Sequence, residues 1–295
     1  MEPLPQAQSP LLRERFAEVG GGVRLHVVES GDGFPVLLLH GFPEHWYSWR
    51  HQIAALAPRF RVIAPDQRGY NTSDKPGDYR LDAIVDDAAA LIAQAGGRAH
   101  VVGHDWGAPV AWQLALRHPD AVARLAILNG PHPVAMARAL RSSHRQRLRS
   151  WYMAVFQIPR LPEWLLTRDG ARALGRLRGD FAHPERLTDE DLARYREAFL
   201  QPGAARAAID WYRAARRGGR SSLAAWRGNR VRSPTLIFWG TRDRYLGAEA
   251  IENVGEWMDG PLTITRLEAA GHFVQQDCPD EVNAALLEFF GEAKG

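Results

Sequence analysis

Residues 101–108 place the tightest constraint on how this 295-residue chain can fold. An apolar run leads into the stretch and a helical pattern of apolar residues follows it, and between them lies the spacing G-x-D-x-G with Asp105 at its centre. A sharp turn from strand to helix brings backbone against backbone, so a Cβ at Gly103 or Gly107 would clash. The spacing predicts a tight turn that lifts Asp105 above a sheet, where the N–H groups of the following helix favour negative charge.

The rest of the first half of the chain alternates between strands and helices. Two alternating segments flank three glycines and predict a hairpin, and continuous apolar runs are typical of strands buried on both faces. Helical patterns or turns separate these runs, which implies a largely parallel sheet with right-handed crossovers. The predicted strands of this half are 15–19, 23–28, 35–39, 61–64, 99–102 and 125–128.

The alternation stops near residue 133 and resumes near residue 231. The residues between carry helical patterns and no convincing strand, whereas 234–239 and 262–267 again read as strands and 281–290 as a final helix. We therefore predict an α/β fold with a mostly parallel eight-stranded sheet flanked by helices and an inserted helical lid. The predicted core domain comprises residues 1–132 and 231–295, and the predicted lid domain comprises residues 133–230.

Composition narrows the possible partners. The net charge is +3, and the arginines that dominate the positive charge occur without a nucleic-acid-binding motif, so we interpret them as solvated helix faces. No apolar run is long enough for a membrane span, and no secretory leader is visible. The single cysteine, Cys278, excludes an intramolecular disulfide and a cysteine metal cluster. We expect a cytoplasmic protein that binds no metal, nucleic acid or membrane.

Reactive side chains follow several of the predicted strands. His40, Asp105, Asp243 and His272 each come just after a strand, and ligands of such sheets bind beyond the carboxyl ends of the strands. The order of nucleophile, acid and histidine, together with the glycine pair, predicts a catalytic triad of Asp105, Asp243 and His272. The pattern G-x-S-x-G does not occur in the chain, which disfavours a serine esterase.

A carboxylate nucleophile implies a particular chemistry. It attacks an sp³ carbon that carries a leaving group and forms an alkyl ester on Asp105, which water activated by His272 then hydrolyses. The tetrahedral intermediate of the second step requires an oxyanion hole. We predict that the backbone N–H groups of Phe42, in the loop 40–43, and of Trp106 form it.

These motifs resemble those of the epoxide hydrolases of the α/β-hydrolase superfamily, over nearly the whole chain. The segments that carry the resemblance are His40-Gly41-Phe42-Pro43-Glu44, Asp66-Gln67-Arg68-Gly69-Tyr70, Ser73-Asp74-Lys75-Pro76, Gly103-His104-Asp105-Trp106-Gly107 and Asn129-Gly130-Pro131-His132-Pro133. The resemblance implies hydrolysis of a small-molecule epoxide without a cofactor, in a monomer or homodimer.

The same resemblance assigns two lid residues and the substrate contacts. Segments similar to the family's two tyrosine signatures contain Tyr152 and Tyr212, which are then expected to hold and protonate the epoxide oxygen. Phe42, Pro43 and Trp106 are expected to contact the substrate together with these tyrosines.

Two other functions stay open from the sequence. A haloalkane dehalogenase also uses an aspartate nucleophile, and Trp106 fits both readings. The dehalogenase reading is disfavoured because Phe42 stands where dehalogenases commonly carry an asparagine donor. A small-molecule sensor with vestigial catalysis is the third reading, and the complete set of catalytic side chains argues against it.

Overall fold

The computed structural model describes residues 11–291, with only the backbone of residues 219–222. Within this range, eight strands form one sheet in the order β1-β2-β4-β3-β5-β6-β7-β8. Only the edge is antiparallel, where β2 pairs with β1 and β4; the remaining pairs are parallel. The strands are β1 (Arg13–Glu18), β2 (Arg24–Ser30), β3 (Phe34–Leu39), β4 (Phe60–Pro65), β5 (Ala99–His104), β6 (Val122–Leu128), β7 (Thr235–Gly240) and β8 (Leu262–Leu267). The predicted fold class is confirmed.

Helices cover both faces of this sheet. Val36 and Leu38 of β3 pack in a cluster with residues of α1 and α11, whereas Leu37 and Leu39 pack in a second cluster with α2 and α3. This alternation follows from the pleat, which turns successive side chains to opposite faces. Burying each of these side chains contributes about 1.5–3 kcal/mol. The covering helices are α1 (Arg50–Leu56), α2 (Leu81–Gln94), α3 (Gly107–Arg117), α10 (Val274–Asp277) and α11 (Pro279–Phe290).

The turn between β5 and α3 has the predicted construction. A Cβ added at Gly103 would collide with the carbonyl group of Gly107, and one added at Gly107 would collide with that of Leu39. Asp105 has a φ of 47°, in the left-handed region that side chains other than glycine, asparagine and aspartate seldom adopt. The close approach of the helix to the strands therefore holds Asp105 in a strained conformation at the sheet edge.

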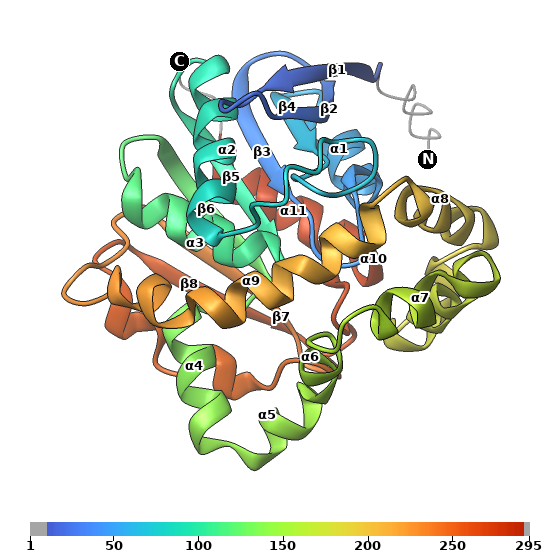
Figure 1. Cartoon of the computed structure of the whole chain (residues 1–295). Coiled ribbons are helices and arrows are strands. Elements are labelled where there is room, and N and C mark those ends of the chain that lie inside the picture. Colours follow the sequence, from blue (N-terminus) through green and yellow to red (C-terminus); the bar gives the residue numbers. More distant parts are fainter. Residues whose placement is uncertain (1–10, 292–295) are drawn as a thin grey trace, which may run out of the picture.

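Helices fill the insertion between β6 and β7. They are α4 (Pro133–Ser142), α5 (His144–Arg149), α6 (Trp151–Val155), α7 (Leu161–Ala171), α8 (Asp189–Leu200) and α9 (Ala204–Ala224). In Figure 1, α4 to α6 lie below the sheet, α7 and α8 lie to its right, and α9 crosses the middle of the view. We refer to residues 133–230 as the lid. We propose that the lid is a domain separate from the core. Within residues 11–291, no helix has the length and apolar character needed to cross a membrane.

Residues 11–291 also contain short 3-10 helices. They are η1 (Trp46–Trp49), η2 (Arg172–Asp180), η3 (Pro184–Arg186), η4 (Ala248–Ala250) and η5 (Val254–Trp257). The lid is less regular than its helical pattern suggests, because residues 168–170 of α7 leave helical geometry. The predicted cap of α8 is present: the Thr188 side chain and Asp191 bond each other's backbone N–H groups.

Candidate active site

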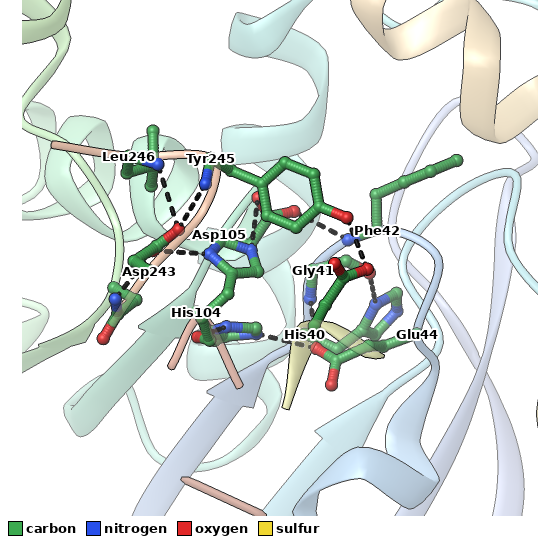
Figure 2. A network of polar contacts seen from close by, with 12 residues as sticks. His40, Gly41, Phe42, Glu44, His104, Asp105, Asp243, Tyr245 and Leu246 are labelled. Atoms are coloured by element: carbon green, nitrogen blue, oxygen red, sulfur yellow. Dashed lines mark hydrogen bonds and ion pairs between the residues drawn. The ribbon is translucent and has the colours of Figure 1, made fainter. Parts of the chain in front are cut away.

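The three predicted triad residues meet at the carboxyl edge of the sheet. The His272 ring joins the other two: Nδ1 lies 2.8 Å from Asp243 Oδ2, and Nε2 lies 3.3 Å from Asp105 Oδ2. His272 and Asp243 are buried, at 3% and 2% exposure, so water does not screen the electrostatic attraction between these two side chains. Figure 2 shows Asp105 between Asp243 on one side and Phe42 on the other. The geometry matches a nucleophile, a base and an acid that orients the base.

Four hydrogen bonds hold the Asp243 carboxylate. Oδ1 accepts the backbone N–H groups of Tyr245 and Leu246, at 2.7 and 3.0 Å. Oδ2 accepts the Asn129 amide at 2.7 Å in addition to His272. Burial opposes ionisation of Asp243, but the charge of His272 and these hydrogen bonds outweigh it and lower the carboxyl pKa. Asn129 was not predicted as a site residue, although its position directly after β6 is a signal of the same kind as that of Asp243.

The loop after β3 supplies a donor to the nucleophile. The Phe42 N–H donates to Asp105 Oδ1 at 2.7 Å. His40 shapes this loop: its Nε2 accepts the Gln67 N–H at 3.1 Å, so its Nδ1 carries the proton and donates to the Gly41 carbonyl at 2.9 Å. The predicted oxyanion-hole donor Phe42 thus lies next to Asp105. The role of Trp106, the N-cap residue of α3, stays a prediction.

The charges of the triad stabilise one another. Burial raises the pKa of Asp105, but the hydrogen bond and charge of His272, with a contribution from the Phe42 N–H, bring it below its ordinary value. Burial lowers the pKa of His272, but the charges and hydrogen bonds of Asp243 and Asp105 raise it well above its ordinary value. Both directions favour the ionised form of Asp105 and the protonated form of His272 when the two groups lie side by side.

The two predicted tyrosines and Asp105 line the same cavity, which has a volume of about 350 Å³. Tyr152 lies on α6 and Tyr212 on α9, their ring centroids are 6.0 Å apart, and both line the cavity with Asp105 and Trp106. Burial raises the pKa of both phenols, and the negative charge of Asp105 raises it further. Both hydroxyls therefore keep their protons at neutral pH and are available as donors.

The cavity wall differs in part from the predicted substrate contacts. Neither Phe42 nor Pro43 is among the described residues that line it. The Phe42 ring lies behind the wall and packs edge-on against Tyr212, with centroids 5.4 Å apart. Most of the wall consists of apolar residues that the sequence analysis did not single out, including Met136, Leu140, Met153, Leu223 and Leu246.

A second buried network lies beneath His272. His104 Nε2 lies 2.9 Å from the His272 carbonyl oxygen, and His104 Nδ1 lies 2.7 Å from Glu44 Oε2. Glu44 also accepts the side-chain amides of Gln275 and Gln276, at 3.1 and 2.8 Å. The network fixes the backbone that carries His272. The sequence analysis names His104 and Glu44 only as members of motifs and predicts no contact between them, because no local pattern pairs residues 60 positions apart.

Comparisons with known proteins agree with this geometry. A family model described as the alpha/beta hydrolase fold matches residues 35–278. The chain is 40% identical to the AB hydrolase superfamily protein YfhM of Bacillus subtilis, over 91% of this chain and 94% of that protein. It is 36% identical to Epoxide hydrolase 4 of Mus musculus, over 92% of this chain and 77% of that protein. Among solved structures, a Bacillus megaterium epoxide hydrolase in complex with an inhibitor superposes with a TM-score of 0.83 at 31% identity, covering 94% of this chain and 99% of that one.

The fold and the family model define the chain as an α/β hydrolase. Its relatives and structural neighbours narrow this classification: the chain belongs to the epoxide hydrolase family of that fold. Family membership confirms the predicted resemblance.

Proposed function

We propose that this protein hydrolyses an epoxide to a vicinal diol through a covalent ester on Asp105. The observation that carries the proposal is that two phenols, Tyr152 and Tyr212, line the same cavity as the Asp105 carboxylate, which His272 contacts at 3.3 Å. The family assignment supports an enzyme that acts on epoxides. Phenol donors and a nucleophile on the wall of one cavity suit a substrate whose leaving group is its own ring oxygen.

The first half-reaction opens the ring. Asp105 Oδ2 attacks one epoxide carbon, because Oδ1 is held by the Phe42 N–H. The carbon–oxygen bond of the ring breaks, and the ring oxygen takes a proton from Tyr152 or Tyr212 while the other phenol donates a hydrogen bond. The product is a hydroxyalkyl ester on Asp105 and one tyrosinate.

The second half-reaction releases the diol. His272 Nε2 takes a proton from water, and the resulting hydroxide attacks the Asp105 carbonyl carbon. Oδ1 becomes the oxyanion, and the Phe42 N–H, which already lies 2.7 Å away, stabilises it. The ester bond then breaks, so the diol leaves with an oxygen from Asp105. The departing alkoxide takes the proton from His272, and the proton that the attacking hydroxide brought to the Asp105 carboxyl group returns to the tyrosinate.

Product formation from a panel of epoxides and a matched panel of haloalkanes tests the proposed function. We expect diol from lipophilic epoxides, because the cavity wall is predominantly apolar. Release of halide at a comparable kcat/KM would favour the dehalogenase alternative, and turnover of neither panel would favour a sensor.

The rate of ester hydrolysis is expected to rise with pH and to level off once His272 is neutral. Burial lowers the pKa of His272, and the charges of Asp243 and Asp105 more than restore it. Esterification removes the charge of Asp105, so the midpoint of ester hydrolysis should lie below the pKa of His272 in the free enzyme. Quenched-flow measurement of ester decay, with NMR titration of His272, compares the two values.

Asp243→Asn provides the check on this assignment. Without the carboxylate charge, the pKa of His272 falls, so the midpoint of ester hydrolysis should move to lower pH while the plateau rate decreases. An unchanged midpoint in this variant would show that His272 is not the titrating base.

A further inference from the structure

Tyr245 occupies a position that the proposed mechanism does not use. It lies in the loop after β7, residues 243–247, which we call the acid loop. Its backbone N–H donates to Asp243 Oδ1 at 2.7 Å. Its ring lies edge-on to His272, with centroids 5.1 Å apart, and edge-on to Tyr152 at 5.5 Å. In Figure 2 the Tyr245 ring extends from the Asp243 side across Asp105. One residue thus contacts the acid, the base and one of the lid phenols.

The acid loop is bonded to the lid on both sides of α6. The Tyr245 hydroxyl donates to Asp180 Oδ2 at 2.5 Å, and Asp180 ends η2, which follows α6 in the chain. Gln146 of α5, which precedes α6, donates to the Tyr245 carbonyl at 2.9 Å and accepts the Gly247 N–H at 2.8 Å. The loop that holds Asp243 therefore also holds the segments that flank Tyr152.

The segment next to Asp180 also contacts the His272 loop. Asp277 accepts the N–H groups of Gly271, Ala182 and His183 at 2.8, 3.2 and 3.0 Å. The Phe181 and Phe273 rings stack with centroids 4.8 Å apart. The end of η2 thus lies directly on the loop that carries the base. The Tyr245–Asp180 bond is a further link between this segment and the core.

We propose that Tyr245 is a positioning residue that, through its hydrogen bond to Asp180, sets the distance between the lid tyrosines and Asp105. The epoxide has to fit between a nucleophile on the core and donors on the lid, so this distance governs ring opening. A displacement of about 1 Å in such a geometry costs roughly 100-fold in rate. The kinetic part of the proposal rests on the proposed function, whereas its structural part does not.

The chain offers a matched control for this bond. Tyr47 of η1 donates its hydroxyl to Asp191 Oδ1 of α8 at 2.9 Å, which is also a tyrosine–aspartate bond between core and lid. The Tyr47 ring packs against His45 and Tyr195, whereas the Tyr245 ring packs against His272 and Tyr152. Tyr47→Phe and Tyr245→Phe therefore each remove one hydroxyl and one core–lid hydrogen bond, and only Tyr245→Phe does so at a residue whose ring contacts His272 and Tyr152.

The test compares ester formation and ester hydrolysis in these variants by rapid quench. Tyr245→Phe and Asp180→Ala are each expected to slow ester formation by about 10-fold or more and to change ester hydrolysis less than threefold, because the Asp243–His272 contact stays. The double variant should be no slower than either single one, since all three lack the same bond. Asp180→Asn, whose amide oxygen still accepts the bond, should restore most of the rate, and Tyr47→Phe should match the wild-type rate.

Hydrogen–deuterium exchange gives a readout that is independent of turnover. Tyr245→Phe should increase amide exchange in residues 172–183 and in α6, and Tyr47→Phe should not. Wild-type exchange and wild-type ester formation in Tyr245→Phe would overturn the positioning role, even if its melting temperature drops. If the wild-type protein turns over no epoxide, the proposed function fails, and the exchange data alone then decide whether Tyr245 ties the lid to the core.

Discussion

Asp105→Ala is expected to abolish epoxide turnover, with no residual ester and no diol above the uncatalysed background. The variant removes the only group that the account assigns to attack on the substrate carbon, and neither phenol nor histidine replaces it. Reactions that lose their covalent nucleophile commonly lose many orders of magnitude in rate. Diol formation followed by mass spectrometry of the whole protein measures both quantities.

Asp105→Asn is the control for this loss. Asparagine tolerates the left-handed backbone that Asp105 adopts at φ 47°, so this variant should fold like the wild type while it lacks the charge. His272→Gln should behave differently from both Asp105 variants, because it keeps the nucleophile: an ester of substrate mass should accumulate on the peptide that contains Asp105. Turnover by folded Asp105→Ala at a measurable fraction of the wild-type rate would contradict the assignment.

Replacing both Tyr152 and Tyr212 by phenylalanine is expected to slow ester formation by about 10²–10⁴-fold, the usual contribution of positioned proton transfer. In the double variant no phenol hydroxyl is left to protonate or hydrogen-bond the alkoxide that forms when the ring opens. Each single variant should lose roughly 10-fold or more, since one donor remains. Ester hydrolysis should change much less, because His272 and the Phe42 N–H govern that step. Single-turnover kinetics separate the two rates.

Tyr195→Phe serves as the matched control for the tyrosine pair. Tyr195 is also a buried lid phenol, but its hydroxyl donates to Gln276 at 3.3 Å and it is not among the described residues that line the cavity. Its variant should open epoxides at the wild-type rate. Wild-type ring opening by a well-folded Tyr152→Phe/Tyr212→Phe protein would make the pair ordinary core aromatics and remove the main argument against a dehalogenase.

The fold was predictable because its signals are local and periodic. Buried parallel strands produce continuous apolar runs, and the glycines at 103 and 107 are required by contacts that the structure contains. The meeting of Asp105, Asp243 and His272 followed from topology alone, since parallel strands end at one edge of the sheet. No side-chain detail was needed to bring these three residues together.

The supporting residues of the site were not predictable in the same way. The Tyr245–Asp180 bond joins positions 65 residues apart in different segments, and Asn129 acts through an amide that no triad pattern includes. Such pairs depend on how the lid packs on the core, and amphipathic periodicity identifies only which face of a helix is buried. The substrate contact of Pro43 stays a prediction: its motif places it beside the site, and it is not among the described residues that line the cavity.

A single turnover in ¹⁸O-labelled water tests the central claim, a covalent ester on Asp105, most directly. With enzyme in excess over epoxide, the first diol should contain no label, because its new oxygen comes from the Asp105 carboxylate. The label should appear instead in the peptide that contains Asp105. Labelled diol and an unlabelled peptide in that first turnover would show direct attack of water on the epoxide and would contradict the account.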